Sequence, residues 1–255
     1  LAGLGIVVAT VLAYGNSFAG PFVFDDLLSI RDNPTLAAPD WRALVPPAGG
    51  GLTVEGRPLL NFSFALNRAL SGHAVWSYHA TNLAIHSVAA LALFGFVRRT
   101  FRLPAFSEGW RRLADTIGLA TALLWALHPV QTESVTYLVQ RAESLMGMWF
   151  LLAFYGLVRG AADGGGRWHG LAIGACYAAA LSKEVAAAIP FLAFFYDRTY
   201  LSGGFRAAWR ARWRVHAALF GSWAVVAALV AASGSRGGTV GFGSNVAWLD
   251  YALTQ

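Results

Sequence analysis

Two adjacent aspartates follow the first apolar segment of the chain, in the sequence Phe-Val-Phe-Asp-Asp. Asp25 or Asp26 could cap a helix that begins directly after them, which is a common use of aspartate. Two carboxylates in a row exceed what a cap needs, however, and a carboxylate 2.6–3.2 Å from a hydroxyl group can accept its proton. We therefore interpret Asp25 and Asp26 as candidate catalytic residues. They are also the candidate metal ligands if the reaction uses a divalent cation, Mg²⁺ or Mn²⁺; no other cofactor is indicated.

Three cations lie far from these acids in sequence. Arg57 precedes a proline at the predicted start of a helix, where it could equally anchor that helix at a membrane interface. Lys183 and Glu184 interrupt an apolar run, so they should line a cavity or pair with a neighbour. Arg141 could offer its guanidinium to a phosphate or form an ion pair.

Two further side chains near Arg141 are candidate supporting residues. Glu133, Tyr137 and Arg141 are spaced four residues apart, so one continuous helix would place them on one face. His128, with the proline that follows it, closes a predicted membrane span, where a histidine is often merely solvated. The six histidines and single cysteine show no zinc spacing, and no glycine-rich phosphate loop or nucleophile elbow is present.

The elements that position these residues are predicted to be membrane helices. Of the 255 residues, 56% are hydrophobic and only 13% are charged, and the mean hydropathy is +0.51. Soluble domains usually contain about 25% charged residues. The apolar residues fall into about seven blocks, which predict spans at residues 1–14, 79–97, 113–127, 142–158, 170–181, 185–196 and 215–232. A polar stripe of His79, Asn82 and His86 on the second span is explained by helix packing through hydrogen bonds.

Charge predicts the orientation of these spans. Twelve arginines lie in the segments 98–112, 159–169 and 198–214, which share one side if the spans alternate. Cytoplasmic loops carry such an excess of arginine. We therefore expect these three loops in the cytoplasm, and the long acidic loop 20–78 outside it. The net charge of +6 thus reports topology and gives no reason to expect nucleic acid as a partner.

Two segments need particular arrangements. The apolar periodicity after Pro58 predicts a surface helix with residues 59, 62, 66 and 70 on its apolar face. Residues 171–196 could form one long helix, but this would bury Lys183 and Glu184 in hydrocarbon. Two short helices that meet at residues 182–184 avoid that cost, and we prefer this hairpin.

The polar motifs together resemble the membrane part of the transmembrane and tetratricopeptide-repeat O-mannosyltransferases. The resemblance covers roughly residues 20–201 and rests on motifs in the same order, namely Phe22–Asp26, Arg31–Pro34, Arg57–Leu59, the helix at residues 64–70, His79-x-x-Asn82-x-x-x-His86, Ala126–Val135, Arg141–Glu143, Leu181–Glu184 and Phe195–Asp197.

The resemblance implies an all-α polytopic membrane protein, a helical bundle of the GT-C glycosyltransferase fold with short surface helices on its first extracytoplasmic loop. It further implies an inverting enzyme that transfers a sugar, mannose or another hexose, from an undecaprenyl or dolichyl phosphate to a hydroxyl of a protein or glycan acceptor. Asp25 would be the base, and Arg57, Arg141 and Lys183 would hold the donor phosphate, supported by His128, Glu133 and Glu184. Arginine suits a phosphate, and cations stabilise a departing phosphate.

The chain departs from the family pattern, since no tetratricopeptide repeat is visible and the later membrane helices are absent. We expect residues 1–255 to be a single transmembrane domain cut from a longer protein. One lysine among nineteen basic residues favours a bacterial inner membrane over an endoplasmic reticulum membrane. A non-catalytic scaffold of the same fold and a transporter remain alternatives.

Overall fold

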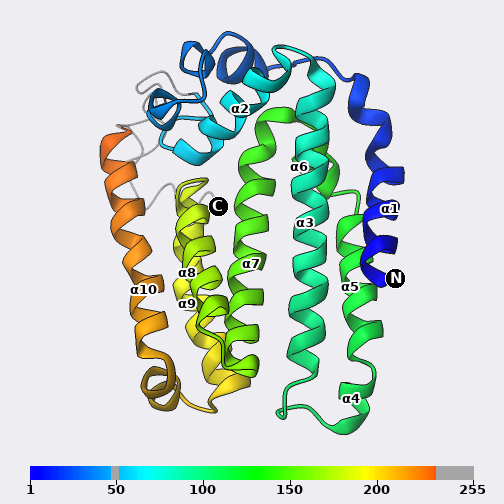
Figure 1. Ribbon diagram of the computed structural model, residues 1–255, viewed down its shortest axis with the longest axis vertical. Helices are drawn as coiled ribbons and strands as arrows, with labels where there is room; N and C mark the ends of the chain where they lie inside the picture. Colours follow the sequence, from blue (N-terminus) through cyan, green and yellow to red (C-terminus); the bar gives the residue numbers. More distant parts are fainter. Residues whose placement is uncertain (47–51, 234–255) are drawn as a thin grey trace, which may run out of the picture.

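The computed structural model describes residues 1–46 and 52–233, which form an all-α polytopic membrane protein, as the sequence predicted. Figure 1 shows long helices that run side by side, covered at one end by the loop that follows α1. The α-helices are α1 (Ala2–Tyr14), α2 (Pro58–Ser71), α3 (Val75–Phe101), α4 (Glu108–Arg112), α5 (Ala114–Ala126), α6 (Gln131–Thr136), α7 (Arg141–Asp163), α8 (Gly166–Ala180), α9 (Ile189–Tyr196) and α10 (Phe205–Ala232).

Four helical segments of the described chain are long and apolar enough to cross a membrane. They are Ala2–Ala19, Val75–Phe101, Leu138–Asp163 and Phe205–Ala232. The other predicted spans correspond to α5, α8 and α9, which have 13, 15 and 8 residues. At 1.5 Å per residue, the eight residues of α9 extend only about 12 Å, so its ends depend on neighbouring segments to complete a crossing.

The helices pack through small residues and buried polar groups. α3 lies against α1, α5 and α7, and α7 lies against α8. At the α7–α8 contact, a Cβ added to Gly156 would lie 2.8 Å from the backbone oxygen of Trp168, so only glycine permits this approach. The predicted polar stripe on α3 packs as expected, since the His86 ring lies 2.9 Å from the Ala126 carbonyl oxygen and the Asn82 amide donates to the Val135 carbonyl.

The arginine-rich segments and the long loop lie at opposite ends of the bundle. Figure 1 places α4, the α7–α8 turn and the segment before α10 at the lower end, and the loop with α2 at the upper end. The chain reverses between α8 and α9, which is the hairpin predicted at residues 182–184.

α2 forms where its proline and apolar periodicity predicted it, but its buried face is different. Leu60, Asn61 and Phe64 are buried, whereas Leu66 and Leu70 are exposed. The buried face is partly polar because Asn61 donates to the Ala43 carbonyl and to the Thr35 hydroxyl, which ties the loop to α2. Of the predicted apolar face, Leu66 and Leu70 are turned outward, whereas Leu59 and Phe62 are half-buried and pack against the core.

Candidate functional site

Asp25 lies on the surface of the loop end, with its carboxylate accessible. Its Oδ2 is 3.4 Å from the Thr53 hydroxyl, and its backbone N–H donates to the Tyr137 hydroxyl at 3.1 Å. Burial raises the pKa of Tyr137. The preceding residue, Phe24, has φ 47°. A left-handed conformation at a bulky residue costs about 1–3 kcal/mol and persists only where surrounding contacts impose it. The backbone that presents Asp25 is therefore held in place.

Asp26 has the opposite environment. It is 1% exposed, and its two carboxylate oxygens accept the backbone N–H groups of Val23 and Val139 at 3.1 and 2.8 Å. Burial raises the pKa of Asp26, although both hydrogen bonds oppose the shift. Asp26 thus ties the loop to the turn before α7, and its geometry is that of a positioning residue.

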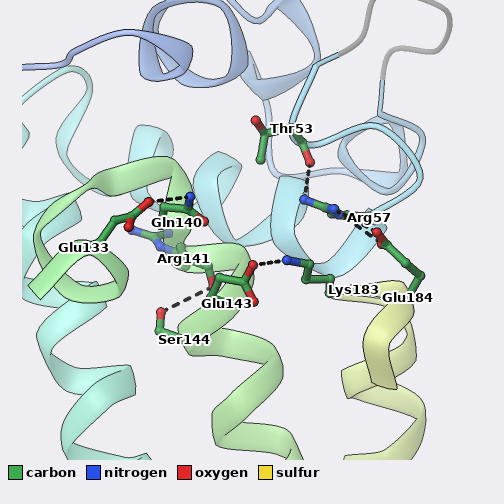
Figure 2. Close-up of polar contacts among 9 residues, drawn as sticks. All are labelled: Thr53, Arg57, Glu133, Gln140, Arg141, Glu143, Ser144, Lys183 and Glu184. Carbon is green, nitrogen blue, oxygen red and sulfur yellow. Dashed lines mark hydrogen bonds and ion pairs between the residues drawn. The ribbon is translucent and has the colours of Figure 1, made fainter. Parts of the chain in front are cut away.

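Arg57 connects the loop to the α8–α9 turn. Its guanidinium donates to the Thr53 carbonyl at 3.0 Å and to Glu184 Oε1 at 3.2 Å, as Figure 2 shows. Nearby, the Leu59 N–H donates to the Leu181 carbonyl at 3.0 Å. The start of α2 and the end of α8 are therefore joined at two points, one through the backbone and one through side chains.

Lys183 forms an ion pair with Glu143, in the first turn of α7. Because Lys183 adjoins Glu184, the partner of Arg57, the two cations lie in one region between the start of α7 and the turn after α8 (Figure 2). The Glu143 and Glu184 side chains are 39% and 36% exposed. Both ion pairs therefore border solvent, where a ligand can reach them.

Thr53 links this cationic region to the acid. Its hydroxyl lies at Asp25 and its carbonyl oxygen accepts a hydrogen bond from Arg57. The structure thus brings together three residues that the sequence singled out, Asp25, Arg57 and Lys183. It adds Thr53 and Glu143, which sequence reasoning missed. Glu143 was part of the Arg-Ala-Glu motif, but nothing in the sequence signalled its pairing with Lys183.

Arg141 lies beneath this region and is fully buried. Its guanidinium donates to Asn82 Oδ1 at 2.6 Å, to the Ser63 carbonyl at 3.2 Å and to the Tyr78 carbonyl at 3.1 Å. The guanidinium also lies 4.4 Å from the Phe64 ring centre. With all three nitrogens engaged and no exposed surface, Arg141 has the geometry of a residue that positions α2 and α3 rather than of a phosphate ligand.

The prediction that Glu133, Tyr137 and Arg141 share one helix face is wrong. α6 ends at Thr136, Tyr137 is extended with ψ 114°, and α7 begins only at Arg141. The Asp26 carboxylate stabilises this break because it accepts the Val139 N–H. Glu133 is exposed and accepts a hydrogen bond from the Gln140 amide (Figure 2).

His128 is also exposed, and its Nδ1 accepts the Val130 N–H at 3.2 Å. This contact orders the turn between α5 and α6. The hydrogen bonds of His128 and Glu133 are thus local, to Val130 and Gln140.

The acids of the site do not form a complete metal-ligand set. Within the described ranges, no three His, Cys, Asp or Glu side chains converge as a metal site requires. Both oxygens of Asp26 already accept backbone N–H groups, so Asp25 is the single exposed carboxylate of the pair. If the reaction uses a divalent cation, Asp25 would be its protein ligand, and the substrate phosphate and water would have to supply the remaining oxygen ligands.

Comparison with known proteins gives relatives of one kind. Human Protein O-mannosyl-transferase TMTC1 is 36% identical over 155 residues, which are 57% of this chain and 16% of the human protein. Drosophila melanogaster Protein O-mannosyl-transferase Tmtc3 is 30% identical over 223 residues, 76% of this chain and 24% of the fly protein. Caenorhabditis elegans Protein O-mannosyl-transferase F38B6.6 is 28% identical over 158 residues, 58% of this chain and 21% of the worm protein.

The chain spans less than a quarter of the length of each of these relatives. No protein-family model and no solved structure matches it. The resemblance that the motifs indicated is nevertheless confirmed: over more than half of its length, this chain is similar to protein O-mannosyl-transferases of animals.

Proposed function

We propose that this chain carries the reacting face of a membrane glycosyltransferase, which moves mannose or another hexose from a polyprenyl phosphate to a hydroxyl group of a protein serine or threonine. The observation that carries the proposal is the bridge at Thr53. It places an exposed carboxylate, Asp25, beside a cationic region formed by Arg57 and Lys183.

The carboxylate suits the attacking hydroxyl of a displacement reaction, and the cations suit its leaving phosphate. The acceptor hydroxyl transfers its proton to Asp25 while its oxygen forms a bond to the anomeric carbon of the sugar. The bond from that carbon to the phosphate oxygen breaks, and the polyprenyl phosphate leaves with the electron pair. Arg57 and Lys183 stabilise the negative charge that grows on this phosphate. Because attack and departure occur on opposite sides of the anomeric carbon, a single displacement inverts its configuration.

The carboxylates of Glu143 and Glu184 hold the two cations before the donor binds. In each ion pair the carboxylate side chain borders solvent. The donor phosphate can therefore displace the carboxylate from the cation, or bind the cation beside it, and the displaced carboxylate remains in water. An arginine fork adds geometric selection for phosphate oxygens, whereas lysine contributes a point charge. The proposed mechanism has no metal-dependent step.

The membrane helices support a lipid-linked donor. The ion pairs lie where α2 and the α8–α9 turn meet at one end of the apolar bundle (Figure 1), so a polyprenyl chain can remain in the bilayer while its phosphate reaches them. The arginines at the opposite end favour an extracytoplasmic position for this face. The names of the relatives support mannose as the sugar and a protein as the acceptor.

A transfer assay tests the proposal. Purified protein in detergent is incubated with peptides rich in serine and threonine, and with labelled mannose supplied either as polyprenyl-phosphate mannose or as a nucleotide sugar. We expect label on peptide only from the lipid-linked donor, in the inverted configuration. Transfer from the nucleotide sugar would contradict the donor assignment. Donor binding with no transfer to any hydroxyl acceptor would favour the scaffold alternative.

A further inference from the structure

A cavity of about 770 Å³ lies at the arginine-rich end of the bundle, away from the candidate site. It is formed by α3, α7 and the segment between α9 and α10, whose lower ends are seen in Figure 1. Ligand sites typically have volumes of about 300–1,000 Å³. Four arginines line it: Arg98, Arg99 and Arg102 on α3, and Arg212 on α10.

The arginines on α3 outnumber the carboxylates that face them. Asp115 accepts both Arg98, at 2.6 Å, and Arg102, at 2.7 Å. Asp163 accepts both Arg99, at 3.3 Å, and Arg159, at 3.1 Å. Four guanidinium groups therefore share two carboxylates, which leaves two positive charges uncompensated among these groups.

These pairs are open to a competing anion. The side chains of Arg98, Arg102 and Asp115 are 39%, 45% and 59% exposed. Ion pairs this exposed contribute little stability, so an anion can displace the carboxylate at small cost. Arg212 differs, since Asp197 holds its guanidinium through two bonds of 2.6 Å. Because Asp197 already holds this guanidinium, we do not assign Arg212 as a ligand residue.

Most of the remaining cavity lining is apolar. Val88 and Leu91 on α3 and Leu152 on α7 line it toward the middle of the bundle. Both helices are long and apolar enough to span a membrane, so this part of the wall lies at acyl-chain depth while the arginines lie at the helix ends. A soluble anion would use the arginines alone, whereas a lipid would use both surfaces.

We propose that this cavity binds the phosphate headgroup of an acidic phospholipid, with one acyl chain against the apolar wall. Basic pockets between membrane helices bind anionic headgroups in this way. Arg98 and Arg102 are the principal phosphate ligands, and Asp115 is their competitor. The site is separate from the proposed transferase chemistry and does not depend on it.

Native mass spectrometry of the purified protein, with added phosphatidylglycerol or phosphatidylcholine, tests the site. We expect the protein to retain one phosphatidylglycerol and no phosphatidylcholine at equal concentration. The double variant R98Q/R102Q should lower phosphatidylglycerol affinity by about 30-fold or more, since each arginine near an anionic lipid contributes about fivefold. The matched control R111Q/R112Q removes the same charge from exposed arginines of α4, outside the cavity, and should retain the lipid.

Asp115→Asn gives a result of the opposite sign, and so separates lost binding from lost folding. It releases Arg98 and Arg102 from their carboxylate, and phosphatidylglycerol affinity should rise severalfold. Equal retention by R98Q/R102Q and the parent, or no gain in Asp115→Asn, overturns the proposal. Displacement of the lipid by millimolar inorganic phosphate would also overturn it, because the site would then select a soluble anion.

Discussion

The two ends of this molecule use the same residue types in opposite ways. At the arginine-rich end, Asp197 is fully buried and accepts hydrogen bonds from Arg212, Ser202 and the His216 ring at 2.6–2.8 Å. At the loop end, Asp25 is exposed, and among the described residues its carboxylate has one long contact, 3.4 Å from the Thr53 hydroxyl. The lone pairs of the Asp197 carboxylate are occupied by hydrogen bonds, whereas those of the Asp25 carboxylate remain largely accessible.

The electrostatics follow from this difference. Burial alone would raise the pKa of Asp197, but the hydrogen bonds from Arg212, His216 and Ser202 outweigh it and hold the pKa well below its usual range. A carboxylate held so firmly as an anion is a poor base. A carboxylate whose oxygens all accept hydrogen bonds therefore has a structural role. A carboxylate with accessible oxygens can also take part in a reaction.

Of the substitutions considered, Asp25→Asn should have the largest effect on turnover, because Asp25 is the carboxylate that remains accessible. General-base catalysis contributes about 10²–10⁴-fold, so turnover in the transfer assay should fall by about that factor. Donor binding should persist, because Arg57 and Lys183 are unchanged. Asp32→Asn, at an exposed acid of the same loop that pairs with Arg31, serves as the matched control and should retain activity. Near-normal transfer by Asp25→Asn protein would return this residue to a structural role.

Asp197→Asn should instead destabilise the fold. Breaking a buried ion pair costs about 3–5 kcal/mol, so the thermal unfolding midpoint in detergent should fall clearly. Asp163→Asn, at an exposed ion pair on the same end, should change it little.

The pH dependence of Asp197 has a defined sign. Because its pKa is lowered by folding, its stabilising contribution is present above the ordinary value of 3.8 and is lost as the pH falls through the lowered value. The stability difference between parent and Asp197→Asn protein should therefore be constant from pH 7 to 5 and shrink on further acidification. A difference that grows below pH 4 would contradict the assignment.

Arg57→Gln tests whether the guanidinium of Arg57 binds the donor phosphate. A hydrogen bond to a charged group contributes about 1.5–3 kcal/mol, so kcat/KM for the lipid-linked donor should fall about 10- to 150-fold. Arg57→Lys keeps the charge but loses the fork and should lie between the parent and Arg57→Gln. Equal kcat/KM in all three proteins would remove Arg57 from the phosphate site.

Asp26→Asn should have the smallest effect, and chiefly on stability. An asparagine can accept through one oxygen, so one of the N–H groups of Val23 and Val139 loses its partner, at a cost of about 1–3 kcal/mol. The unfolding midpoint should fall while turnover per folded molecule changes less than in Asp25→Asn. A loss of turnover equal to that of Asp25→Asn, with unchanged stability, would make Asp26 a second reacting carboxylate.

The sequence was sufficient for most of the membrane helices and for the hairpin between α8 and α9. Apolar blocks predict membrane helices because hydrocarbon leaves the backbone few alternatives, and the cost of burying Lys183 predicts the turn after α8. The break at Tyr137 was not predictable, since residues 131–141 contain neither glycine nor proline. A hydrogen bond from Val139 to Asp26, 113 positions earlier, stabilises it.

The same limit applied to the site. A basic residue at a helix start is normally exposed, so burial of Arg141 requires knowledge that Asn82, Ser63 and Tyr78 supply acceptors together. The pairing of Lys183 with Glu143 joins residues 40 positions apart, and the contact of Thr53 with Asp25 spans 28. Such contacts depend on how segments that are distant in the sequence pack together. The local spacing of apolar and polar residues does not predict this packing.

The contact between Arg57 and Glu184 also sets when the site can form. These residues are 127 positions apart, and a ribosome that adds about 5–20 residues per second needs roughly 6–25 s to make the intervening chain. Throughout that interval α2 has emerged but lacks the partners that the α8–α9 turn supplies. The ion pair between Arg57 and Glu184 can therefore form only after the α8–α9 hairpin has entered the membrane.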